Sequence, residues 1–122
     1  MTTDHNGYMA KAESWLELAR KLAGTRNISS HIAYTKEYAR KAGISLEDIG
    51  SGDNELTELL VKGYVAEAES WLELARKLAD KRNIEPLIVY VNEYREKAGV
   101  SPERIGTSSE ELDRLRNRYE TV

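Results

Sequence analysis

The chain has 122 residues, of which 40% are hydrophobic and 32% charged, so it can bury a core and does not have a disordered composition. Its net charge of −3 argues against a basic nucleic-acid domain, and the lack of cysteine excludes disulfides and thiolate metal sites. No apolar run is long enough to span a bilayer, and the first eight residues do not resemble a signal peptide. The composition predicts a cytoplasmic protein without a membrane segment.

The first predicted helix runs from Tyr8 to Ala23, after a polar lead in which Asp4 and Asn6 are candidate N-caps. At 100° per residue its apolar side chains fall on one broad face, formed by Tyr8, Ala12, Trp15, Ala19 and Leu22. The opposite side is charged and carries Glu13, Glu17, Arg20 and Lys21. Because the apolar arc is wide, we expect this helix to pack against more than one neighbour.

A second helix is predicted from an N-cap at Ser29 to Ala42, where Gly43 ends it. Its expected inward residues are His31, Thr35, Tyr38 and Ala42. A short capped turn follows, from Ser45 to Gly50. The polar character of this helix predicts either that part of it is exposed or that it lines something polar.

A long helix is predicted next, from about Asn54 to Ala79, because the apolar spacing continues through Gly63 without a break. Gly63 is a weak point in it, costing about 1 kcal/mol relative to Ala. Another helix and capped turn follow, with inward residues Leu87, Val91, Tyr94 and Ala98. The last segment repeats the start of the long helix with more polar residues, as expected where an array ends and its outer face meets water.

An internal repeat organises these elements. The twelve residues AESWLELARKLA occur at 12–23 and again at 68–79, and residues 7–50 align without a gap on residues 63–106 with 29 of 44 positions identical. This pattern predicts a tandem duplication of a helical-hairpin unit. We therefore expect an all-α fold of five main helices with pseudo-twofold symmetry, in which residues 1–122 form a single domain and a continuous long helix joins the two repeats.

One stretch resembles the DNA-binding helix-turn-helix motif. Ala39, Gly43, Ile44 and Ile49 match its small, turn and core positions. The following segment is acidic and would repel phosphates, and in the second repeat Arg95 stands where a small residue is required. We favour the simpler interpretation, a helix C-terminus followed by a capped turn.

Catalytic and metal-binding motifs are absent from the sequence. His5 and His31 have no partner at metal-ligand spacing, and there is neither a glycine-rich phosphate loop nor a Gly-x-Ser-x-Gly elbow. Paired carboxylates such as Glu13 and Glu17 sit among basic neighbours that would not raise a pKa. We expect no catalytic residues, metal or cofactor, although the chain could be an accessory domain of a larger enzyme.

Basic residues gather near one end of each predicted hairpin, with an asparagine and a tyrosine nearby. The candidate ligand-binding residues are Arg20, Lys21, Arg26, Asn27, Tyr34 and Lys41 in the first repeat, and Arg76, Lys77, Lys81, Arg82, Asn83, Tyr90 and Lys97 in the second. Cations beside half-exposed aromatic rings can hold a nucleotide or a single strand of nucleic acid. The simpler interpretation, which we favour, is that these cations stabilise helix C-termini and the tyrosines lie at the edge of the core.

The functional prediction follows from what the repeats keep unchanged. The first helix of each repeat is identical even at the outward residues Glu13, Glu17 and Arg20, whereas the second helix differs at inward positions. We expect a non-enzymatic binding or assembly module that uses this charged face to contact a protein partner or a second copy. The alternative is an accessory domain that binds nucleotides or single-stranded nucleic acid at two related sites.

Overall fold

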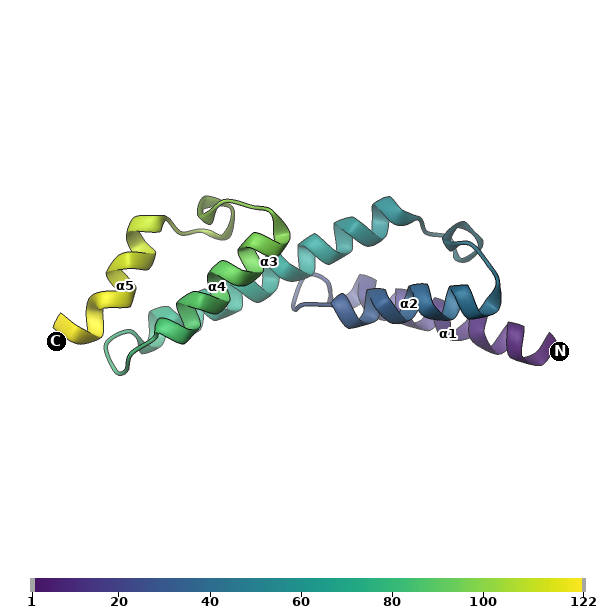
Figure 1. Ribbon diagram of the computed structural model, residues 1–122, viewed down its shortest axis with the longest axis horizontal. Coiled ribbons are helices and arrows are strands. Elements are labelled where there is room, and N and C mark those ends of the chain that lie inside the picture. The colour runs from purple at the N-terminus through teal and green to yellow at the C-terminus, as the bar shows by residue number, and fades with distance from the viewer. Residues whose placement is uncertain (1, 122) are drawn as a thin grey trace. The chain divides into compact units, whose positions relative to one another are not determined.

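The computed structural model describes the backbone of residues 2–121 and the side chains of residues 6–119. Over this range the chain forms α1 (Thr2–Leu22), α2 (Ser29–Ala42), the 3₁₀ helix η1 (Leu46–Ile49), α3 (Asp53–Leu78), α4 (Glu85–Ala98), the 3₁₀ helix η2 (Pro102–Ile105) and α5 (Ser109–Thr121), with no strand (Figure 1). The predicted all-α class with five main helices is confirmed.

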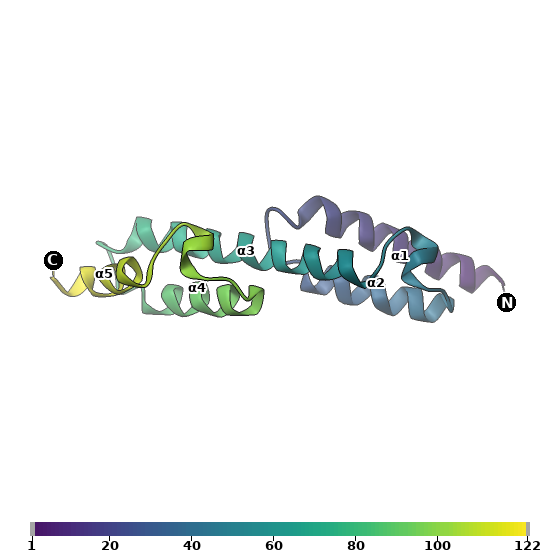
Figure 2. The ribbon, with the colours of Figure 1, turned by 90° about the horizontal axis from the view of Figure 1, so that it is seen from above.

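The helices pack as two compact units, and the division between them falls inside α3, between Gly63 and Tyr64. In the first unit α1 and α2 lie side by side and run in opposite directions (Figures 1 and 2). In the second unit, α4 lies against the second part of α3, where Trp71 stacks on Tyr90. Each unit is thus a helical hairpin, to which η1 and the start of α3, or η2 and α5, are added.

The core of the first unit is formed by small and branched side chains from all three helices. Its buried residues are Ala12, Leu16, Ala19, Ala23, Ile28, Ile32, Ala39, Ile49 and Leu56. Alanines at two of the three buried α1 positions let the helices approach closely, and each fully buried leucine or isoleucine contributes about 1.5–3 kcal/mol. The centre of the buried face lies at Leu16, whereas the predicted centre, Trp15, is only half-buried.

The inward face predicted for the second helix of each unit is confirmed at Thr35, Ala42, Val91 and Ala98, which are buried, and is wrong elsewhere. Ile32 and Ile88 are buried, although the prediction left them out, while Tyr38 and Tyr94 are only half-buried. The physical reason is that the hairpin is covered on one side by a third helix, whose Leu56 or Leu112 is buried. The core therefore lies between three helices rather than at the seam of two.

The ends of the helices follow ordinary capping rules, with two corrections. Gly43 ends α2 in the left-handed conformation (φ 69°) and the following η1 has four residues, so the capped turn is confirmed and no recognition helix follows. The N-cap of α2 is Ile28 rather than the predicted Ser29, whose backbone N–H is instead bound by the Asn27 side chain at 2.9 Å. Helix α1 already includes Thr2, because no proline interrupts the polar lead, so the candidate N-caps Asp4 and Asn6 lie within the helix.

Gly63 lies where the loop between α1 and α2 meets α3. A Cβ atom at this position would lie 2.7 Å from the Arg26 carbonyl oxygen and 2.9 Å from Ile28 Cγ1, so no side chain fits without moving the backbone. At the start of the first repeat, Gly7 would meet nothing within 4 Å. The matching position 56 residues after Gly63 holds Tyr119, which is 47% exposed.

Candidate functional site

Arg20, a candidate for ligand binding, is held by groups of its own unit. Its Nε and Nη2 atoms donate to the two carboxylate oxygens of Glu55, each at 2.7 Å, and Nη2 also donates to the Gly50 carbonyl oxygen at 3.0 Å. Such a bidentate, charge-assisted pair has fixed geometry. Arg20 therefore ties the end of α1 to the end of η1 and to the first turn of α3.

Arg76 makes the same contacts in the second unit. It donates to Glu111 at 2.9 and 2.7 Å and to the Gly106 carbonyl oxygen at 2.9 Å. We call each of these arrangements, Arg20 with Glu55 and Arg76 with Glu111, an arginine clamp. The arginine hydrogen bonds, helped by hydroxyl groups of Ser51 and Thr107, lower the pKa of each glutamate to about 2.

Asn27 and Asn83, two further candidates, cap the helices that follow them. The side-chain oxygen of Asn27 accepts the Ser29 N–H at 2.9 Å, and that of Asn83 accepts the Glu85 N–H at the same distance. Both bonds satisfy a backbone donor at a helix N-terminus, which has no partner within the helix. The identity of these asparagines in both repeats thus has an internal explanation.

The other basic candidates near the hairpin loops are exposed. Lys77 lies 3.6 Å from Glu73, one turn away on α3. Lys21, Arg26, Lys81 and Arg82 make no ion pair with any residue whose side chain the structure describes. These four cations are the part of the predicted cluster that remains available to an external group.

Tyr34 and Tyr90 lie at equivalent places, stacked on tryptophans. The ring centroids of Tyr34 and Trp15 are 4.6 Å apart, and those of Tyr90 and Trp71 are 4.7 Å apart, each pair inclined by 27°. Tyr34 is 46% exposed and Tyr90 42% exposed. One side of each tyrosine is therefore packed while much of its surface meets solvent.

Lys41 and Lys97 lie near the far ends of α2 and α4, close to other tyrosines. The Lys41 Nζ atom is 5.6 Å from the Tyr8 ring centroid and 5.5 Å from that of Tyr38, and Lys97 lies similarly over two tyrosine rings. At 1.5 Å per residue, about 18 Å of helix separates Lys41 from the start of α2 beside Arg26. The predicted residues of one repeat are thus spread along the hairpin and do not converge on one small-molecule site.

The outer side of the identical stretches, residues 12–23 and 68–79, carries a surface of which the candidate residues included only Lys21 and Lys77. Shallow hollows are lined by Ser14, Glu17, Leu18 and Lys21 in the first unit and by Ser70, Glu73, Leu74 and Lys77 in the second. We call this set the repeated surface. Leu18 is 41% exposed and Leu74 39% exposed, both unusually open for leucine. Apolar periodicity alone did not indicate this surface, because it cannot tell which part of a wide apolar arc the neighbouring helices leave uncovered.

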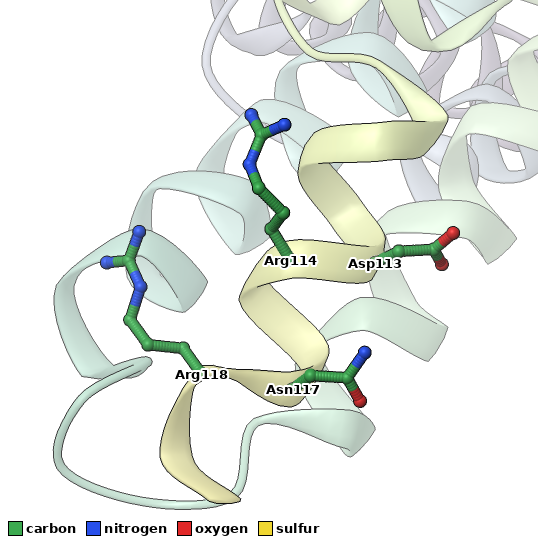
Figure 3. A pocket seen from close by; sticks show the side chains of 4 residues that line it. All are labelled: Asp113, Arg114, Asn117 and Arg118. Atoms are coloured by element: carbon green, nitrogen blue, oxygen red, sulfur yellow. The ribbon is translucent and has the colours of Figure 1, made fainter. Parts of the chain in front are cut away.

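A further hollow lies on α5 and is lined by Asp113, Arg114, Asn117 and Arg118. In Figure 3 the two arginine side chains point to one side of the helix, and Asp113 and Asn117 point to the other. Arg118 also lies 3.5 Å from Asp80. Because all four residues come from one helix and do not converge, we assign no function to this hollow.

Two general properties of the described residues bear on the site. Among side chains 6–119, no three His, Asp or Glu residues are grouped closely enough to hold a metal ion. Across the helices of residues 2–121, none has both the length and the apolarity needed to cross a bilayer. Comparisons with protein-family models, with curated proteins and with solved structures find no significant match.

Proposed function

We propose that this chain is a non-enzymatic helical binding and assembly module that presents the same docking surface twice. The observation that carries this proposal is the exposure of large apolar side chains at equivalent places in both units, with Leu18 matched by Leu74 and Tyr34 by Tyr90. Exposed leucines and tyrosines flanked by charges are typical of protein docking sites. The charged rim, which includes Glu13 and Glu17, would supply specificity.

The internal repeat supports this function if it arose by tandem duplication of one helical-hairpin unit. On this proposal, residues 1–122 are a single domain with pseudo-twofold symmetry, and each half offers one copy of the repeated surface. Two linked copies of a surface raise the effective affinity for a partner that can engage both. A cytoplasmic setting remains a prediction from the cysteine-free composition.

Site-specific photo-crosslinking in extracts of the source cells tests the proposal. A photoreactive amino acid at position 18 or 74 is expected to capture the same protein, whether a second copy or a different chain, and excess unlabelled module should abolish the product. Exposed positions on the third helices, Glu58 and Arg114, are the matched controls. Equal capture at all four positions, or products that nuclease removes, would contradict protein docking at the repeated surface.

A second candidate function is the binding of nucleotides or single-stranded nucleic acid. It is favoured by the open faces of Tyr34 and Tyr90, and by the absence of internal ion pairs at Lys21, Arg26, Lys81 and Arg82 among the described side chains. The spread of these groups suits a strand of several nucleotides better than a mononucleotide. An NMR titration with mono- and oligonucleotides distinguishes the two functions, because salt-dependent shifts at Tyr34 and Tyr90 are expected only for the second.

A further inference from the structure

An apolar groove lies in the second unit, beside the repeated surface. It is lined by Leu74, Leu78, Arg82, Asn83, Pro86 and Leu87, at the place where the end of α3 meets the start of α4. On the basis of the docking function proposed above, we propose that this groove binds an acidic amphipathic helix of a partner protein. The proposal is carried by the juxtaposition of three leucines and a proline with an arginine that has no ion-pair partner among side chains 6–119.

The lining of the groove determines the apolar part of the ligand. Leu74 and Leu78 are one helical turn apart on α3, and Leu87 and Pro86 face the same hollow from α4. Leu74 is 39% exposed and also belongs to the repeated surface, so the two are continuous. An amphipathic helix with apolar residues at i and i+4 presents them at a matching spacing.

The charges around the groove determine the polar part of the ligand. Three carboxylates flank groove residues in the sequence, and each has a basic partner within the unit: Glu73 with Lys77, Asp80 with Arg118 and Glu85 with Arg116. In contrast, Lys81 and Arg82 have no carboxylate partner among the described side chains. Counting only the part of the chain whose side chains are described, basic groups around the groove outnumber acidic ones, which complements acidic residues on a docked helix.

The first unit differs at the two positions that make this groove apolar. Ser30 and His31 stand where the second unit has Pro86 and Leu87. His31 packs edge-on against Trp15 with ring centroids 5.4 Å apart, and its Nδ1 atom is buried without a hydrogen-bond partner. A docked apolar helix would further desolvate this polar ring, so the acidic helix should prefer the second unit.

Two designed peptides of about 18 residues, long enough to be partly helical, test the inference. Both carry leucines at i and i+4, and their polar positions are all Glu in one and all Lys in the other. The acidic peptide is expected to bind the full chain at least tenfold more tightly than the basic one, with NMR shifts at Leu74, Arg82 and Leu87. The double variant P86S/L87H, which copies residues that the first unit tolerates, should weaken binding about tenfold.

Single-charge variants complete the test. Arg82→Gln should weaken acidic-peptide binding several-fold, whereas Lys36→Gln, which removes an exposed cation from α2, should leave it unchanged. Equal binding of both peptides, shifts centred on Leu18, or no binding would overturn the groove assignment. A concentration-dependent sedimentation coefficient that P86S/L87H abolishes would make the occupant a second copy and would also overturn it. Crosslinking at positions 18 and 74 tests the docking function separately, so failure of one proposal is distinguishable from failure of the other.

Discussion

The two units of this chain share one set of contacts and differ in another. Both have an arginine clamp, an asparagine cap and a tyrosine stacked on a tryptophan, with closely similar distances. They differ in the buried polarity of the second helix, in the groove beside the repeated surface, and at the end of the third helix. The shared contacts maintain the fold of each unit, while the differing residues change the polarity of its core and of its surface.

The differences cluster on the second helix of the hairpin. Thr35 is fully buried and donates its hydroxyl to the His31 carbonyl oxygen at 2.8 Å, where the second unit has the equally buried Val91. Ala39 is buried in the first unit, whereas Arg95 in the second donates to the Val100 carbonyl oxygen at 2.9 Å. Residues 12–23 and 68–79 of the preceding helices are identical, so exchanging or removing features in one unit at a time isolates the effect of these differences.

The largest change in stability is expected at Gly63, which the loop between α1 and α2 covers. Gly63→Ala should destabilise the chain by about 2–3 kcal/mol, because the added Cβ overlaps the backbone at Arg26. Gly7→Ala is the matched control and should stabilise by up to about 1 kcal/mol, since the methyl group meets open space and alanine favours the helix. Urea unfolding followed by circular dichroism measures both, and equal stability of the two variants would contradict the close approach.

A smaller change in stability is expected from exchanging Thr35 and Val91, the equivalent buried residues of α2 and α4. Val91→Thr should destabilise by about 1–2 kcal/mol, because a hydroxyl enters a fully buried apolar position. The reverse change, Thr35→Val, should be neutral or stabilise by about 0.5 kcal/mol, since it removes a polar group without changing the side-chain shape much. If Thr35→Val proves as costly as Val91→Thr, the Thr35 hydrogen bond is essential to the first unit.

The arginine clamps predict a pH dependence that both units share. The folded-state pKa of Glu55 and Glu111 is about 2, below the ordinary 4.5, so the unfolded chain binds more protons between these values. Their contribution is present above pH 4.5 and is lost as the pH falls toward 2. Glu55→Gln and Glu111→Gln should each cost about 1 kcal/mol at pH 7 in these partly exposed pairs. The double variant should lose less stability between pH 5 and 3 than the parent, and an unchanged acid profile would contradict the clamps.

The smallest loss of stability is expected from removing the asparagine caps of α2 and α4. Asn27→Ala and Asn83→Ala should each destabilise by about 0.5–1 kcal/mol, because a backbone N–H at the start of α2 or α4 loses its acceptor. Asn83→Asp should retain most of the stability, since aspartate offers the same acceptor. Thermal unfolding detects the difference, and an aspartate variant as unstable as the alanine variant would show that the cap is not the reason for the asparagine.

The helices themselves could be predicted from the sequence because their signals are local. Apolar periodicity predicted the helices, and Gly43 marked the end of one of them, where it adopts the left-handed conformation. The start of α2 was misplaced because the capping group is the side chain of Asn27, one residue before the N-cap itself. The predicted inward faces were shifted because periodicity describes one helix and cannot tell from which side a third helix will cover it.

The candidate site was harder to predict because its residues have partners distant in the sequence. In the sequence Arg20 looks like a free surface cation, but in the structure it donates to Glu55, 35 residues later. A signal for this pair did exist, since Arg76 and Glu111 keep the same separation in the other repeat. The exposure of Leu18 depends on which side of α1 the third helix leaves uncovered, and no local pattern contains that information.

The contact at Gly63 also means that the third helices of the two units cannot be exchanged freely. The backbone at Arg26 lies so close to α3 that only a residue without a side chain fits at this position. The counterpart in the second unit is Tyr119, so transplanting residues 109–119 into the first unit would bring a tyrosine ring against the Arg26 carbonyl oxygen. The two helices are therefore not interchangeable, although their arginine clamps are alike.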